Sequence, residues 1–154
     1  MATTIIAIGN VTRGDDGVAH RVLERLETQL TDAECEGLAL TAVHQLDFGM
    51  TSELAETGFV IFIDAERRGE PPVDVIEVVP GPGVASLHGV DPDGLLGLAE
   101  TLYGTAPPAF LVSVAAPIME HVEGLSDIAE AASIEAASVV RALLAEHGGR
   151  LGTR

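Results

Sequence analysis

Five consecutive apolar residues at positions 59–63 (Phe-Val-Ile-Phe-Ile) place the strongest constraint on what this chain can fold into. Side chains alternate between the two faces of a strand, so an apolar run of this kind must be covered on both faces. Strands of that type occur in parallel sheets that have helices packed against each side. The run therefore favours an α/β fold built in three layers.

Strand-like and helical patterns alternate along the rest of the chain. Four more segments are β-prone: residues 3–8, 38–43, 73–79, which alternates as an edge strand does, and 110–115. Helical spacing of apolar residues predicts helices at residues 19–30, 51–56, 93–102 and 126–146. This order predicts an α/β three-layer sandwich with a mainly parallel central sheet flanked by helices.

The length and charge of the chain limit its organisation and its partners. The 154 residues fit one domain, which we expect to span residues 1–148, with 149–154 as a frayed tail. The formal charge of −16 argues against binding to nucleic acid or to a membrane surface. The sequence contains no Lys, which excludes P-loop phosphate binding and Schiff-base catalysis.

A single cysteine, Cys35, excludes an internal disulfide and a Cys-rich zinc site. The first residues lack the basic region of a secretory signal, and no apolar run approaches the length of a membrane span. These features predict a cytoplasmic protein.

Polar residues that could bind a ligand or take part in catalysis follow three of the β-prone runs. The first group is the turn 9–17, which contains Asp15 and Asp16; the second is Asp64, directly after the 59–63 run; the third is His88, in a Gly/Pro-rich loop. Ligands of open α/β sheets bind outside the carboxyl ends of the strands, where these residues are expected.

Each of these residues also has an ordinary structural interpretation. Asp15 and Asp16 could both serve the start of a helix, or one could cap while the other faces outward as a cation ligand. Asp64 could cap a turn, and His88 could be a solvated loop residue. Taken together, two carboxylates and one imidazole form an open O,O,N site suited to a borderline metal.

Four motifs, in order, resemble those of the [NiFe]-hydrogenase maturation endopeptidases. The apolar strand 5–8 with Gly-Asn, followed by Asp-Asp-Gly at 15–17, resembles the first motif. The segment 60–65, ending in Asp-Ala, resembles the second, and Ser-Leu-His-Gly at 86–89 resembles the third. Gly-Leu-Ser at 124–126 resembles the start of the family's last helix.

This resemblance implies an activity and a set of site residues. It implies an endopeptidase that removes the C-terminal extension of a [NiFe]-hydrogenase large-subunit precursor after nickel insertion. By position, the residues that contact the metal are Asp16, Asp64 and His88, and the nickel is supplied by the substrate. The sequence departs from the family pattern at residues 44–46 (His-Gln-Leu) and 117–120 (Pro-Ile-Met-Glu), and no general base is assigned.

Two other classes remain open from the residues alone. A phosphoacceptor receiver domain also places acids after its first strand and an Asp after a central strand, but it needs a Lys that is missing here. A non-catalytic α/β metal-binding module is the second. A serine protease is disfavoured because the sequence has no Gly-x-Ser-x-Gly elbow, and a cysteine protease because Cys35 lies between two acidic residues, Glu34 and Glu36.

Overall fold

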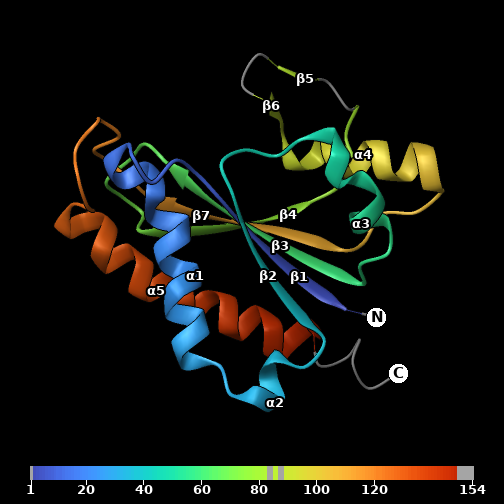
Figure 1. The fold of residues 1–154 in the computed structure, drawn as a ribbon, viewed down its shortest axis with the longest axis horizontal. Coiled ribbons are helices and arrows are strands. Elements are labelled where there is room, and N and C mark those ends of the chain that lie inside the picture. Colours follow the sequence, from blue (N-terminus) through green and yellow to red (C-terminus); the bar gives the residue numbers. More distant parts are fainter. Residues whose placement is uncertain (1, 83–84, 87–88, 149–154) are drawn as a thin grey trace.

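The computed structural model describes residues 2–82, 85–86 and 89–148, and it contains a five-stranded sheet and a two-stranded ribbon (Figure 1). The strands are β1 (Thr3–Ile8), β2 (Leu38–Val43), β3 (Phe59–Glu66), β4 (Val73–Val78), β5 (Ala85–Ser86), β6 (Gly89–Val90) and β7 (Ala109–Ala115). The helices are η1 (Gly14–Gly17), α1 (Val18–Gln29), α2 (Asp32–Cys35), η2 (Phe48–Met50), α3 (Thr51–Ala55), α4 (Pro92–Tyr103), α5 (Asp127–Leu143) and the π-helical turn η3 (Leu144–Gly148). Every strand and helix predicted from the sequence is present. The predicted tail at 149–154 lies outside the described residues.

The strand order of the large sheet is β2-β1-β3-β7-β4. The first four strands in this order run parallel, and β4 pairs antiparallel with β7 at the edge. The predictions of a mainly parallel sheet and of an edge strand near residue 73 are therefore confirmed. β2 lies on one side of β1 and β3 lies on the other. The chain therefore crosses over β1 as it passes from β2 to β3.

The apolar run on β3 is buried on both faces of the sheet, as predicted. Phe59, Ile61 and Ile63 pack in a cluster with apolar residues of α1 and α5. Val60 and Phe62 face the opposite side, in a second cluster that includes apolar residues of α3 and α4. All five side chains are fully buried, so β3 is the centre of the three layers.

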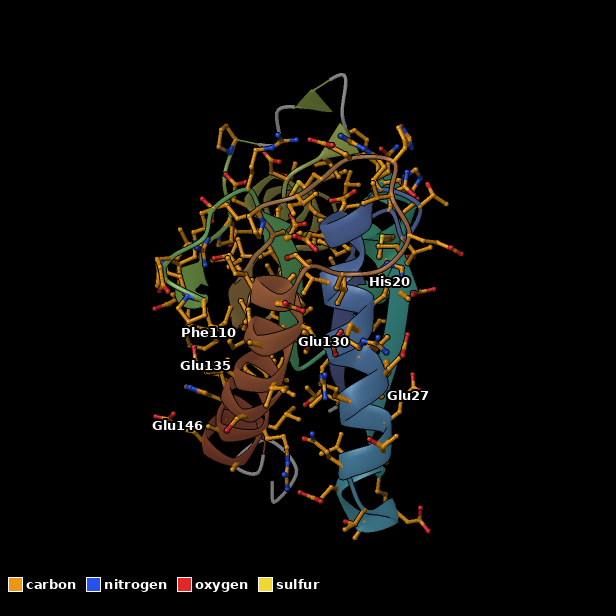
Figure 2. All side chains as sticks on the ribbon, turned by 90° about the vertical axis from the view of Figure 1, so that its left-hand side faces the viewer. His20, Glu27, Phe110, Glu130, Glu135 and Glu146 are labelled. Atoms are coloured by element: carbon orange, nitrogen blue, oxygen red, sulfur yellow. The ribbon has the colours of Figure 1, made fainter. Side chains whose placement is uncertain are left out.

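Ion pairs connect the two helices on one face of the sheet. The guanidinium of Arg25 on α1 pairs with the Glu130 carboxylate and donates from Nε to the Ser133 hydroxyl (2.9 Å). Arg21 also pairs with Glu130, at 3.3 Å. Figure 2 shows α1 and α5 side by side with Glu130 between them. These contacts place the beginning of α5 beside the middle of α1.

None of the helices in the described part of the chain is both long enough and apolar enough to cross a membrane.

Candidate functional site

The carboxyl ends of β1 and β3 form the switch point of this sheet. The connection from β1 to β2 runs through α1 on one face, and the connection from β2 to β3 runs through α3 on the other. These connections diverge at the ends of the two strands, which is where open α/β sheets bind ligands.

Asp64 is the β3 residue that pairs with Ile8, the last residue of β1. The strand extends beyond the apolar run 59–63 and includes Asp64 itself. β3 continues through Glu66 because β7 still pairs with it there, with Glu66 opposite Ala115. β1 ends at this level, so the half-buried Asp64 lies on a strand that continues past the switch point.

The turn between β1 and α1 holds Asp16 over the end of β1. Gly9 has a positive φ of 153°, and a Cβ atom there would lie 2.0 Å from the carbonyl oxygen of Asp16. Only glycine permits this close approach of backbone to backbone. The backbone N–H of Asn10 donates to Oδ2 of Asp16 at 3.0 Å, which fixes the carboxylate.

Asp15 has a different role from its neighbour. Its side chain is 1% exposed and accepts three hydrogen bonds: from the N–H of Ile118 (2.9 Å), the N–H of Ser126 (2.7 Å) and the hydroxyl of Ser126 (2.7 Å). The Ser126 hydroxyl in turn accepts from the N–H of Ala129, in the first turn of α5. Asp15 therefore holds Ser126, the N-cap residue of a helix that begins more than 100 residues later in the chain.

The pKa of the Asp64 carboxyl is raised from its ordinary value of 3.8 to about 7. Burial is the largest cause, because it removes water from the charged form. The backbone N–H of Ala65 opposes this shift, whereas the charge of Asp16 and then that of Asp91 raise the pKa further. The carboxylate of Asp16 is thus close enough for its charge to raise the pKa of Asp64.

Asp91 is an acid of this neighbourhood that the sequence analysis did not identify. It is exposed, occupies the N-cap position of α4 and makes no capping hydrogen bond with its side chain. The signal in the sequence is the Asp-Pro pair at 91–92, which is typical of a helix start. That signal does not reveal that α4 begins near Asp64.

Two of the three predicted metal-contacting residues, Asp16 and Asp64, come together, and the third, His88, lies outside the described residues. In the part of the chain that the structure describes, no group of three or more His, Cys, Asp or Glu side chains could hold a metal ion. The donor chemistry of Asp16 and Asp64 nevertheless fits a divalent cation. Both are carboxylates, and the repulsion between them is relieved when a cation binds.

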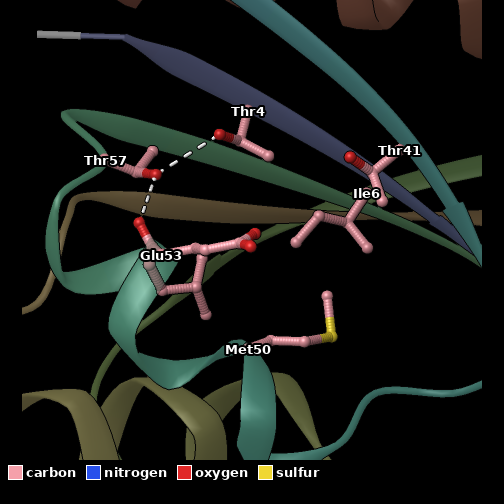
Figure 3. Close-up of a pocket in the computed structure, with 7 residues that line it drawn as sticks. Thr4, Ile6, Thr41, Met50, Glu53 and Thr57 are labelled. Carbon is pink, nitrogen blue, oxygen red and sulfur yellow. Dashed lines mark hydrogen bonds between the residues drawn. The ribbon is translucent and has the colours of Figure 1, made fainter.

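A small cavity lies elsewhere, on the face of the sheet that α3 covers (Figure 3). Its volume is about 30 Å³, enough for one or two water molecules. The lining includes Thr4, Glu53 and Thr57, and the Thr57 hydroxyl donates to the Glu53 carbonyl at 2.9 Å. The cavity is lined from the other end of β1 and contains none of the predicted site residues.

The fold is shared with proteins of known structure. The hydrogenase maturating endopeptidase HybD from Escherichia coli superposes with a TM-score of 0.77 at 22% identity, over 96% of this chain and 94% of that one. An endopeptidase from Escherichia coli gives 0.69 at 24% identity, with 96% and 94% covered. The [NiFe] hydrogenase maturation protease HycI from Thermococcus kodakarensis gives 0.68 at 20% identity, with 93% and 92% covered.

No protein-family model matches the sequence, and no curated protein matches it. At these levels of identity, the structural likeness establishes the fold.

The adjacent acids Asp15 and Asp16 should differ in their effect on stability. Asp15→Ala leaves two backbone N–H groups and a hydroxyl without their acceptor, and we expect the free energy of unfolding to fall by about 2–4 kcal/mol. Asp16→Asn keeps an oxygen that can accept the hydrogen bond from Asn10, so its free energy of unfolding should fall by less than about 1 kcal/mol. Urea denaturation of both variants measures this, and equal losses would contradict the assignment of Asp15 as the structural residue.

Asp64 should make the metal-free protein less stable as the pH rises. Its pKa is about 7 in the folded chain and near 3.8 in the unfolded chain, so the folded state binds the proton more tightly between these values. The stabilisation of the folded state by the proton on Asp64 is complete below about pH 4 and is lost as the pH rises through about 7. We therefore expect Asp64→Asn to melt at a higher temperature than the parent at pH 8, with the difference shrinking towards pH 4.

Thermal scans in the presence of a chelator test this, with the exposed edge-strand variant Asp74→Asn as the control. A difference between Asp64→Asn and the parent that does not depend on pH would show that Asp64 is ionised normally.

Proposed function

We propose that this chain is an endopeptidase that removes the C-terminal extension of a [NiFe]-hydrogenase large-subunit precursor after nickel insertion. The observation that carries the proposal is the pair of carboxylates, Asp16 and Asp64, at the switch point of this fold. The similar structures reported above carry names of hydrogenase maturation endopeptidases, and the likeness covers nearly the whole of both chains. The proposed partner is therefore a protein, and neither nucleic acid nor membrane takes part.

In this proposal the nickel ion arrives as part of the substrate, and the acids of this chain recognise it. Asp16 is held by Asn10 and is positioned to offer a carboxylate oxygen. Asp64 carries a proton for much of the time near neutral pH, because its pKa is about 7, and it must release that proton to bind a cation. His88, as a nitrogen ligand, stays a prediction, as does the cytoplasmic location.

The reaction adds water to one peptide bond: hydroxide joins the carbonyl carbon, the C–N bond breaks, and the leaving amine takes a proton. A metal ion beside that bond polarises the carbonyl or orients the water. The chain contributes by docking the metal so that the scissile bond lies next to the acids. Asp15 does not serve as the general base, because it is buried and both of its oxygens accept hydrogen bonds. Asp16 and Asp64 remain the candidates for this role.

The topology disfavours a phosphoacceptor receiver. The flavodoxin-like order of such domains is 2-1-3-4-5. Here the fourth strand of the chain moves to the outer edge, runs antiparallel and lies beyond β7. A non-catalytic metal-binding module with the same acids is an alternative that the following assay separates from a protease.

A nickel-loaded large-subunit precursor should lose a C-terminal peptide when mixed with this protein, as seen by intact mass. Asp16→Asn and Asp64→Asn remove a charged metal-facing oxygen, and we expect each to slow cleavage at least about 100-fold. We expect the same of His88→Ala. Asp127→Asn, which changes an exposed acid at the start of α5, is the matched control and should cleave at the parental rate.

A precursor of unchanged mass after incubation with the parent protein would overturn the proposed function. Cleavage at the parental rate by any one of the three site variants would remove that residue from the site and leave the function standing.

A further inference from the structure

Three aliphatic side chains stand exposed on the loops beside Asp16. Val11 is 59% exposed in the turn after β1, and Ile118 and Val122 are 44% and 47% exposed in the connection between β7 and α5. Single exposed apolar residues are ordinary, but a group of them beside a candidate site is typical of an interaction surface. We call these three residues the aliphatic rim.

The members of the rim surround one short turn. A Cβ atom on Gly17 would lie 3.0 Å from the Cα of Val11, and one on Gly14 would lie 3.0 Å from Cγ2 of Val122. The carbonyl oxygen of Ile118 is 2.8 Å from that same position on Gly14. Gly14 and Gly17 are the ends of η1, the turn that carries Asp16. Figure 1 shows the two loops side by side at the left of the molecule.

Hydrogen bonds hold the two loops together. Gly14 donates its N–H to the Val122 carbonyl (3.1 Å), and Asp15 donates its N–H to the Ile118 carbonyl (2.9 Å). The guanidinium of Arg13 donates to the carbonyl of Met119 at 3.1 Å. The rim is therefore fixed before any partner arrives, and a preorganised surface loses little conformational entropy on binding.

The charges around the rim indicate what it would bind. Glu120 and Glu123 are exposed in the same connection, and Asp16 lies beside it. The basic residues of these loops are Arg13, whose guanidinium is engaged with a backbone carbonyl, and the exposed His121. An aliphatic surface bordered by carboxylates is complementary to an apolar surface bordered by Lys or Arg. The net charge of −16 strengthens attraction to such a surface.

We propose that the aliphatic rim of Val11, Ile118 and Val122 docks an apolar surface of the precursor, bordered by basic residues, next to its bound nickel. This inference rests on the proposed function. The rim recognises the protein around the metal, and the acids recognise the metal itself, so the two contributions to binding are separable.

The test measures binding and cleavage separately. The precursor, with and without nickel, is immobilised for interferometry, and its Kd is measured for the parent, Val11→Ser and the double variant Ile118→Ser/Val122→Ser. We expect the double variant to raise Kd about tenfold for both forms of the precursor, and Val11→Ser to raise it about threefold. The Kd for Ni²⁺ alone, measured by calorimetry, should stay within about twofold of the parent. Ile134→Ser, at a similarly exposed (55%) position on α5, is the control and should bind the precursor like the parent.

Salt gives a second, independent readout of the same surface. We expect the parental Kd for the precursor to rise between about 0.05 and 0.5 M NaCl, and Glu120→Gln/Glu123→Gln to reduce that rise.

Four outcomes of these measurements are decisive. Weaker binding by the rim variants alone, with Ile134→Ser unchanged, supports the proposal. Cleavage by the parent together with a Kd within twofold for every rim variant overturns the rim and leaves the proposed function intact. Binding by the parent without cleavage overturns the proposed function, while the rim is still judged by its variants. Neither binding nor cleavage by the parent overturns both.

Discussion

The buried carboxylate of Asp15 is the interaction on which the candidate site depends. It accepts hydrogen bonds from Ile118 and Ser126, so it joins the turn after β1 to the connection before α5 across most of the sequence. A charged acceptor that satisfies buried donors contributes more than a neutral one, and its removal leaves those donors unpaired. The bonds therefore do two things. They fix η1, which carries Asp16, and they fix the loop that carries Ile118 and Val122.

The two carboxylates of the candidate site, Asp16 and Asp64, are in an unfavourable electrostatic state when both are charged. Burial and the nearby charge of Asp16 disfavour ionisation of Asp64, so the pKa of its carboxyl is raised. In the proposed function this site would exchange a proton for a cation, so cation binding would weaken as the pH falls below about 7. Because a proton can replace the cation at Asp64, a site of this kind suits a metal ion that binds briefly and is then released. This exchange is consistent with nickel that belongs to the substrate.

The sequence predicted the layers well and the site in part, and the difference has a physical cause. The 59–63 run had to be covered on both faces, and that requirement alone indicated the sheet and its two helical layers. Patterns along the chain also indicated Asp16 and Asp64. They could not indicate that Asp15 would hold Ser126, the N-cap residue of α5, because that bond spans 111 residues and depends on how α1 and α5 pack. Nor could they indicate that β3 would continue past Asp64, since β7 supports those residues from elsewhere in the sequence. The position of Asp91 near Asp64 likewise follows from the tertiary packing of α4.

The proposed recognition through two separate contacts has a consequence for selectivity. A pair of carboxylates is a poor discriminator, because divalent cations bind such ligands with affinities that follow general trends rather than the needs of one reaction. An aliphatic rim by itself is equally unselective, since many proteins expose apolar surface. When one rigid frame holds both, a partner gains the full free energy only if its apolar surface and its cation have the right separation, and tethered contributions of this kind multiply affinity. Asp15 sets that separation here, because the same carboxylate positions Asp16 on one side and Ile118 on the other. For a protein that acts only on a metal-loaded partner, as proposed here, a fixed separation between the two contacts matters more than tight binding at either one.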